Sequence, residues 1–378
     1  MPQPEDELSE PTAVLTREQL AEALAAYDDV GHYLVTIAGA DRGAHVEIGV
    51  TPVTIGRDTQ NVLSFSDTDL SRFHLQVSLV GGEVVVEDRG STNGTFVNDE
   101  RLAVPLTLQE GDRVRAGRQL LTYRRRSRRD VERALELDRG LEVANKYVLA
   151  LLPEPLTSGP VHVTWRFVPS TQLGGDAFGY RWLDPTTFVF YLIDVSGHGV
   201  GPAMHSVTVM NLLRQRALPG VDFENPAEVL SSLNTRFQME SHGGLFFTMW
   251  YGVYRTGDQT LTYGSAGHHP AYLVPSDRCV AQPLGTEALI IGAMGDVVYP
   301  VQQTTVPAGS SIYLFSDGVF EVDTKDGQMW GLRDFLPLLV EPARAGMNEP
   351  ERLYQAVTAA SSTDPLADDF SLVQLTFS

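Results

Sequence analysis

Cysteine, long apolar runs and positive charge are all scarce in this sequence of 378 residues. The single cysteine, Cys279, excludes an internal disulfide framework and is typical of a reducing compartment. No apolar run reaches the roughly 18 residues that a membrane-spanning helix needs, and residues 1–10 are acidic, unlike a signal peptide. We therefore expect a soluble, cytoplasmic protein without a membrane partner.

Lys and Arg number 28 against 48 Asp and Glu, which gives a formal net charge of −20. Proteins bind nucleic acid chiefly by neutralising its phosphates, so this charge argues against a nucleic-acid partner. One stretch is rich in arginine, and we interpret it as a solvated, helix-flanking surface. Its members are Arg113, Arg115, Arg118, Arg124, Arg125, Arg126, Arg128 and Arg129.

Four short motifs in the C-terminal half each place an aspartate at the end of an apolar run that reads as a buried strand. Carboxylates at strand ends can converge on one point, although each motif alone is also ordinary turn chemistry. The order of the four motifs along the chain, together with the residues that flank each of them, favours a shared site. The motifs are Gly174-Gly175-Asp176, Asp194-Val195-Ser196-Gly197-His198-Gly199, Ser316-Asp317-Gly318 and Asp368-Asp369-Phe370, and the predicted strands are residues 188–193, 312–315 and 370–375.

An all-oxygen ligand set suits hard divalent cations, so Mg²⁺ or Mn²⁺ is expected in preference to zinc or copper. Two such ions about 3.5–4 Å apart can hold a hydroxide and stabilise the attacking and leaving oxygens of phosphoester hydrolysis. No cysteine or serine lies in a recognisable nucleophile motif, so we expect direct attack by hydroxide without a phosphoenzyme.

These aspartates and their neighbours resemble the PPM-type protein serine/threonine phosphatases, and more closely the bacterial SpoIIE-type branch, over roughly residues 160–378. The resemblance implies a four-layer α-β-β-α sandwich with two ions, Mn²⁺ or Mg²⁺, in the active site. It implies that Asp194 bridges both ions and that Asp176 and Asp317 bind one each. Asp368 would complete the site, with Asp369 as an alternative ligand.

The turn after Asp194 supplies two further candidates. The resemblance places a main-chain ligand at the Val195 carbonyl, and Gly197 and Gly199 would let the turn adopt positive φ angles. His198 could protonate the leaving oxygen, or it could be a turn residue. One position departs from many relatives, because Gly179 stands where they have a second aspartate. A water-mediated contact to the metals is therefore expected to be missing.

Residues 31 to about 123 contain short strands separated by Gly, Asp and Asn turns, which predicts an all-β sandwich. Three of its loops together resemble the forkhead-associated (FHA) domain, a phosphothreonine-binding module. The loops carry Gly56-Arg57, Ser71-Arg72-Phe73-His74 and Ser91-Thr92-Asn93-Gly94-Thr95, and the predicted strands are residues 33–37, 53–55, 75–79, 84–87 and 119–123.

Physical chemistry assigns roles within these loops. A phosphothreonine dianion calls for a forked guanidinium with a hydroxyl and a second cation nearby, which Arg57, Ser71 and Arg72 can supply. Thr92 and Asn93 are further candidates for peptide binding, with Asn93 holding the peptide backbone. His74 is expected to brace the loop from inside, because an isolated histidine before a strand is usually structural.

A helix is predicted over residues 129–152, which Pro153 and Pro155 would end. Its apolar residues recur at alternating steps of three and four. This spacing fits either a short coiled-coil seam in a homodimer or a helix that docks along its own catalytic domain. The residues are Ala134, Leu137, Leu141, Ala144, Val148 and Leu151.

Further helices are expected over residues 201–217 and 226–240 and, after a Thr16–Gln19 capping box, near the N-terminus. Residues 248–254 and 261–267 are predicted to form a hairpin. His268 and His269, which follow the hairpin, have no zinc-binding spacing and are interpreted as structural.

The predicted organisation has four parts. Residues 1–30 form an acidic segment with a short helix, 31–123 an FHA domain, 124–155 a basic stretch and helical linker, and 156–378 a PPM phosphatase domain. The resemblance suggests a substrate such as a phosphorylated STAS-type anti-sigma-factor antagonist, and a phosphothreonine partner such as a serine/threonine kinase. The alternative is a phosphopeptide-binding adaptor with an inactive phosphatase-like scaffold, which Gly179 motivates.

Overall fold

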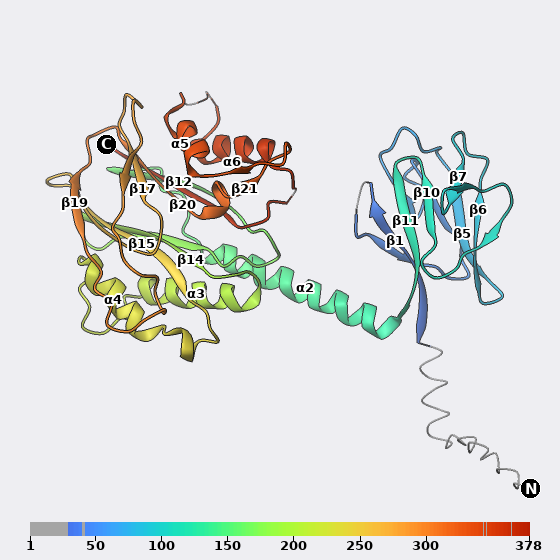
Figure 1. The fold of residues 1–378 in the computed structure, drawn as a ribbon, viewed down its shortest axis with the longest axis horizontal. Coiled ribbons are helices and arrows are strands. Elements are labelled where there is room, and N and C mark those ends of the chain that lie inside the picture. Colours follow the sequence, from blue (N-terminus) through green and yellow to red (C-terminus); the bar gives the residue numbers. More distant parts are fainter. Residues whose placement is uncertain (1–28, 40–41, 343, 345, 364) are drawn as a thin grey trace, which may run out of the picture. The chain divides into compact units, whose positions relative to one another are not determined.

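The computed structural model describes residues 29–39, 42–342, 344, 346–363 and 365–378. The chain divides into two compact units, residues 1–138 and 139–378, which Figure 1 shows together with the helices and strands. The helix predicted after Thr16 lies outside the described residues. Within the described part, no helix has the length and apolar content needed to cross a membrane.

The first unit is a sandwich of two β-sheets, which confirms the predicted all-β domain. One sheet has the order β2-β1-β11-β10-β7-β8 and the other β4-β3-β5-β6-β9. Alternate apolar residues of both sheets form a single buried core that includes Leu34, Ile55, Val77, Val86 and Leu121. The strands are β1 (Val30–Ala38), β2 (His45–Glu47), β3 (Val53–Gly56), β4 (Leu63–Ser64), β5 (Leu75–Val80), β6 (Glu83–Asp88), β7 (Thr95–Val97), β8 (Glu100–Arg101), β9 (Leu106–Thr107), β10 (Arg113–Ala116) and β11 (Gln119–Ser127).

The last strand of the sandwich, β11, is longer than predicted. It was expected to end at residue 123 but continues to Ser127, because its basic residues still pair with β1, as in Arg126 with Gly31. Part of the arginine-rich stretch is thus strand rather than linker. Several of its arginines face acids at the surface, for example Arg128 with Glu47 at 2.7 Å.

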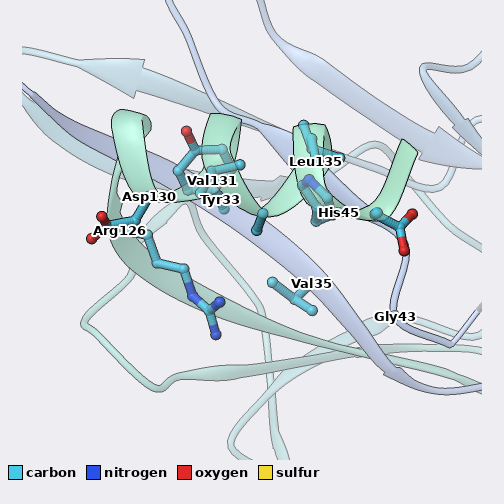
Figure 2. A pocket seen from close by; sticks show the side chains of 10 residues that line it. Tyr33, Val35, Gly43, His45, Arg126, Asp130, Val131 and Leu135 are labelled. Carbon is cyan, nitrogen blue, oxygen red and sulfur yellow. The ribbon is translucent and has the colours of Figure 1, made fainter. Parts of the chain in front are cut away.

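Helix α2 (Arg128–Leu151) begins in the first unit and ends in the second. Its first turns lie over strands β1 and β2. Residues of the helix and of these strands line a cavity of about 360 Å³. Figure 2 shows four residues that line this cavity, Val131 and Leu135 from the helix and Tyr33 and His45 from the strands. The start of the helix therefore forms one wall of a cavity on the sandwich.

The second unit contains two five-stranded sheets, ordered β12-β23-β20-β17-β18 and β13-β14-β15-β16-β19. Helices α3 and α4 pack on the second sheet, and α6 packs on β12 and β23 of the first. Figure 1 shows α3 and α4 on the opposite side of the unit from α5 and α6, which confirms the four-layer α-β-β-α sandwich. The elements are β12 (Val161–Val168), β13 (Ala177–Trp182), β14 (Thr187–Val195), α3 (Val200–Arg214), α4 (Pro226–Arg236), η1 (Met239–Ser241), β15 (Phe247–Arg255), β16 (Thr260–Ala266), β17 (Ala271–Val274), β18 (Gln282–Leu284), β19 (Gln302–Thr305), β20 (Ser311–Phe315), η2 (Asp317–Val319), β21 (Val322–Asp323), β22 (Met329–Trp330), α5 (Leu332–Val340), α6 (Glu349–Ala360) and β23 (Phe370–Phe377).

Strand β14 explains why the acidic motifs follow continuous apolar runs. Phe188, Phe190 and Leu192 belong to the core between the two sheets. The alternating residues Val189 and Ile193 belong to a separate core beneath α3 and α4. A strand covered on both faces must be apolar at every position, so the run ends only where the strand reaches the edge of the core.

The C-terminal half of α2 docks on the second unit. Val148 is buried in the core between the sheets, and Leu141, Ala144 and Leu151 pack against that core. These are four of the six residues of the predicted seam. Leu137, another of the six, is 65% exposed. Most of the predicted seam therefore packs against the core of the same chain.

Two predicted helices are shorter than expected. The helix predicted to reach residue 217 ends at Arg214, and Arg216 has a φ of 54°, which a right-handed helix cannot contain. The helix predicted over residues 226–240 ends at Arg236. Its chain then forms a 3₁₀ turn, η1, where the Met239 amide bonds to the Gly292 carbonyl rather than within a helix.

Candidate functional site

The five predicted aspartates line one pocket of about 260 Å³ in the second unit. Asp176 directly precedes β13, and Asp194 lies near the end of the neighbouring strand β14. Asp317 follows β20, and Asp368 and Asp369 precede its neighbour β23 in the other sheet. Two pairs of adjacent strand ends, one pair from each sheet, thus bring the carboxylates together. The pocket is completed by Val195, Ser196, Gly197, Phe246 and Thr248.

Glycines allow the segments that carry these aspartates to approach closely. A Cβ atom on Gly174 would lie 2.5 Å from Asp369 Oδ2, and one on Gly175 would lie 2.8 Å from the Val195 carbonyl oxygen. A Cβ on Gly318 would overlap the carbonyl oxygen of Asp369. Any side chain at these positions would force the loops apart. The glycines of the sequence motifs are therefore part of what shapes the pocket.

Burial and mutual repulsion raise the pKa values of Asp176, Asp194, Asp317 and Asp368. Burial is the main cause of the raised pKa of Asp176, followed by the charge of Asp194. Burial, and then the charges of Asp317 and Asp368, raises the pKa of Asp194 to about 7. Burial also raises the pKa values of Asp317 and Asp368. A bound cation would relieve this repulsion, which is what a metal site built from aspartates requires.

The donor set fits hard divalent cations. None of the residues lining the pocket is a lysine or arginine, and its ionisable groups are all carboxylates. Among the residues that the structure describes, no group of three or more Asp, Glu, His or Cys side chains is arranged so that it could hold one metal ion.

Asp369 is held differently from the other acids. One of its oxygens, Oδ1, accepts hydrogen bonds from the Ser170 amide at 2.7 Å and the Ser170 hydroxyl at 2.9 Å. The other, Oδ2, accepts from the Gly175 amide at 2.7 Å. Asp369 therefore braces the loop that leads to Asp176. This contact favours a supporting role over that of an alternative metal ligand.

The turn after Asp194 has the backbone that its glycines predict. Gly197 and Gly199 have φ angles of 83° and 95°, which confirms the expected left-handed positions. His198 between them is exposed. Its charge acts on Asp368, whose pKa burial raises and His198 lowers. The imidazole thus lies near the acidic pocket, and its role as a proton donor stays a prediction.

Gly179 lies in β13 and faces away from the acidic pocket. It pairs with Tyr191 of β14, and a Cβ atom on Gly179 would overlap the Tyr191 hydroxyl group. It lines a separate cavity of about 510 Å³ with residues of β13, α3 and the end of α2. Packing against Tyr191 explains why a glycine stands here. The expected absence of a water-mediated contact to the metals stays a prediction.

In the first unit, the predicted phosphopeptide residues lie on three loops that hydrogen bonds join. The Thr92 amide donates to Ser71 Oγ at 3.0 Å, and the Arg57 amide donates to the Ser71 carbonyl at 3.0 Å. The Asn93 side-chain amide donates to the Asp69 carbonyl at 2.8 Å. Ser71 is half-buried, and the other four candidates, Arg57, Arg72, Thr92 and Asn93, are exposed. The structure thus brings all five candidates to one exposed surface.

His74 braces these loops from inside, as predicted. The ring is fully buried, its Nδ1 accepts from the Ser71 amide at 3.1 Å, and its Nε2 lies 3.2 Å from the Gly94 carbonyl. A carbonyl only accepts, so Nε2 carries the proton. The ring therefore connects the Ser71 loop to the loop that carries Thr92 and Asn93.

Sequence reasoning missed Asp88, which shapes the third loop. Its carboxylate accepts from the amides of Gly90 and Ser91 at 2.9 and 2.8 Å, and from the hydroxyls of Ser91 and Thr95 at 2.6 Å each. An aspartate followed two and three residues later by glycine and serine is typical of such a turn. That spacing is visible in the sequence and could have identified Asp88.

Comparison with known proteins gives two matches to family models. The model of Stage II sporulation protein E (SpoIIE) matches residues 184–378, and the model of the FHA domain matches residues 53–117. The first match contains Asp194, Asp317, Asp368 and Asp369. The second contains all five phosphopeptide candidates.

Two curated relatives are each similar to part of the chain. Phosphoserine phosphatase RsbU of Bacillus subtilis is 27% identical over 210 residues, which is 55% of this chain and 61% of RsbU. FHA domain-containing protein FhaB of Mycobacterium tuberculosis is 36% identical over 92 residues, which is 24% of this chain and 59% of FhaB. The chain therefore spans less than two thirds of the length of each.

Among solved structures, the SiaA-PP2C domain of Pseudomonas aeruginosa has a TM-score of 0.57 and 20% identity. The alignment covers 65% of this chain and 98% of that domain. At this identity the similarity concerns the fold of the second unit.

Proposed function

Because this chain belongs to the SpoIIE family, whose model matches residues 184–378, we propose that its second unit is a metal-dependent protein serine/threonine phosphatase. The observation that carries this proposal is the convergence of five aspartates on one pocket at the ends of four strands. Structural ion pairs also bury aspartates, but they do so beside cations, and no lysine or arginine lines this pocket.

Asp176, Asp194, Asp317 and Asp368, with the Val195 carbonyl, would hold two Mn²⁺ or Mg²⁺ ions, with Asp194 between them. When bound, the ions would lower the pKa of a water molecule and neutralise phosphoryl charge. Asp369 keeps the Asp176 loop in place through its bonds to Ser170 and Gly175. We assign to His198, exposed on its turn, the donation of a proton to the departing serine or threonine oxygen.

The substrate that fits this proposal is a phosphoserine or phosphothreonine on a regulatory protein, such as a STAS-type anti-sigma-factor antagonist. RsbU, named a phosphoserine phosphatase, is similar over 210 residues of this chain. The pocket supports a protein substrate because it lies at strand ends and beside the exposed Gly197–His198 turn, where a phosphorylated loop can reach it.

The first unit is assigned the binding of a phosphothreonine partner, such as a serine/threonine kinase. Arg57, whose amide donates to the Ser71 carbonyl, and Arg72, which follows Ser71 in the chain, would supply the guanidinium groups that a dianion requires. We further propose that this binding regulates hydrolysis through α2, which begins against the sandwich and ends in the core of the second unit. A homodimer through α2 would use its exposed residues Leu137, Val143 and Tyr147.

Calorimetric titration with Mn²⁺ separates the enzyme from an adaptor with an inactive scaffold. We expect the full chain to bind two Mn²⁺ ions at pH 8. The pKa of Asp194 is about 7, and its proton competes with the metal, so affinity should fall about tenfold between pH 8 and pH 6.

The variant Asp317→Asn should lose tight binding of an ion, whereas Asp323→Asn, which removes an exposed carboxylate from β21, should bind as the parent does. Absence of Mn²⁺ binding at pH 8, or equal binding by both variants, would favour the adaptor.

A further inference from the structure

Thr248 lies on the wall of the acidic pocket directly beside Asp194. The two residues are partners in the pairing of β14 with β15, and Thr248 is one of the residues that line the pocket. Its hydroxyl oxygen lies 2.8 Å from Nδ1 of His268. A residue on the pocket wall is therefore joined by its side chain to a buried histidine.

The surroundings of His268 fix the direction of this hydrogen bond. The ring is 7% exposed, and its Nε2 lies 3.1 Å from the carbonyl oxygen of Phe315. Because a carbonyl can only accept, Nε2 carries the proton. Burial and the neighbouring His269 also lower the pKa of His268 well below its ordinary value. The ring is thus neutral, Nδ1 has a free lone pair, and the Thr248 hydroxyl must donate to it.

This direction decides what Thr248 can do in the pocket. Its only hydrogen is committed to His268, so its oxygen presents lone pairs and acts as an acceptor. A carbonyl or phosphoryl oxygen cannot donate to it, whereas a water molecule can. The acceptor lies next to Asp194, where the attacking water of a phosphatase has to be oriented.

The histidine also connects the two sheets behind the pocket. Thr248 is on β15 of one sheet, and Phe315 ends β20 of the other, two residues before Asp317. The backbone of His268 is held in turn, since the Ser265 hydroxyl donates to its carbonyl at 2.6 Å and Gly267 has a φ of 68°. One ring thereby sets the distance between the strand beside Asp194 and the strand before Asp317.

We propose that Thr248 accepts a hydrogen bond from the water that attacks phosphorus, and that His268 is a positioning residue that gives Thr248 this polarity. In the attack, the water gives up one proton to bulk solvent, and the resulting hydroxide, whose remaining hydrogen points at Thr248, forms a bond to phosphorus. The bond to the serine or threonine oxygen breaks, and that oxygen keeps the electron pair and takes a proton from His198. Thr248 orients the water and takes no proton from it. This inference rests on the proposed phosphatase function.

The first test compares threonine variants in the full chain. Thr248→Val keeps the shape but removes the oxygen, and we expect kcat on a small aryl phosphate to fall about 10- to 100-fold with KM little changed. Thr248→Ser, which keeps the hydroxyl, should recover most of the parent's kcat. Thr262→Val is the matched control, because Thr262 is half-buried on the neighbouring strand β16 and does not line the pocket.

The second test separates polarity from packing at His268. His268→Asn places an amide oxygen near the position of Nδ1 and can still accept from Thr248. His268→Gln places an amide nitrogen near Nε2 and restores only the bond to Phe315. We expect kcat to be higher in His268→Asn than in His268→Gln at equal melting temperature. A purely structural histidine would give variants whose activities follow their stabilities.

A readout independent of hydrolysis is the nitrogen resonances of His268 in histidine-labelled protein. The parent should show the tautomer protonated at Nε2, and Thr248→Val should shift the Nδ1 resonance towards that of a nitrogen without a hydrogen bond. The role of Thr248 would be overturned if the Nδ1 resonance were the same in Thr248→Val as in the parent. It would also be overturned if the parent were active and Thr248→Val had the same kcat. A parent that releases no phosphate would overturn the proposed function itself.

Discussion

Asp194→Asn is expected to slow phosphate release from a phosphoserine protein by about 10³-fold or more, equivalent to about 4 kcal/mol of lost transition-state stabilisation. Asparagine keeps the size of the side chain but removes the charge that would lie between the two cations. The acids that act on Asp194, among them Asp317, Asp368 and Asp369, lie on other segments of the chain, so none of them can replace it without moving. Single-turnover and steady-state rates of the full chain measure the effect.

The same variant should fold normally, and its stability provides the control. Burial and neighbouring charges raise the pKa of Asp194 to about 7 in the folded state, above its unfolded value. Its protonated form therefore stabilises the fold at low pH, and that contribution is lost as the pH rises through about 7. Without cations at pH 8, Asp194→Asn should melt at or above the parent's temperature. Substantial turnover by a folded Asp194→Asn protein would remove Asp194 from its bridging role.

Arg57→Ala is expected to weaken binding of a phosphothreonine peptide by about 100-fold, because two charge-assisted hydrogen bonds to phosphate are worth about 3 kcal/mol. The peptide affinity of Arg57→Lys should lie between those of the parent and of Arg57→Ala, since lysine keeps the charge but not the forked geometry. Arg124→Ala is the matched control, as Arg124 is an exposed arginine outside the three loops whose guanidinium lies 3.7 Å from the Glu110 carboxylate. Peptide affinities from fluorescence anisotropy give the comparison.

The same variant tests the coupling of the two units. If phosphopeptide binding acts through α2, saturating peptide should change the hydrolysis rate of the parent and leave that of Arg57→Ala unchanged. An Arg57→Ala protein that equals the parent in both peptide affinity and response would contradict the assignment of the phosphate site to Arg57 and the regulatory role of the first unit.

What could be predicted from the sequence depended on local patterns. The runs at residues 188–193, 312–315 and 370–375 are apolar at nearly every position because both faces of their strands are covered, and each lies within a strand as predicted. The aspartates at their ends then had to lie at the edge of the core. The loops with Arg57, Ser71 and Asn93 were recognised because each motif combines glycine or turn residues with polar side chains.

What could not be predicted depends on pairings distant in the sequence. The partnership of Thr248 with Asp194 follows from the register of β15 against β14, and that of His268 with Phe315 crosses from one sheet to the other. Both histidines after the hairpin were interpreted as structural for want of a zinc pattern. The contact of Gly179 with Tyr191, twelve positions away along the hairpin, also depends on strand pairing.

The most direct test is phosphate release from a phosphoserine protein by the full chain, measured with Mn²⁺, with Mg²⁺ and after addition of a chelator. A metal-dependent phosphatase predicts turnover with at least one of the cations, its loss with the chelator and its return when the cation is restored. Turnover that persists in the chelator, or the absence of turnover under every condition by a protein that binds Mn²⁺ in the aspartate pocket, would contradict it.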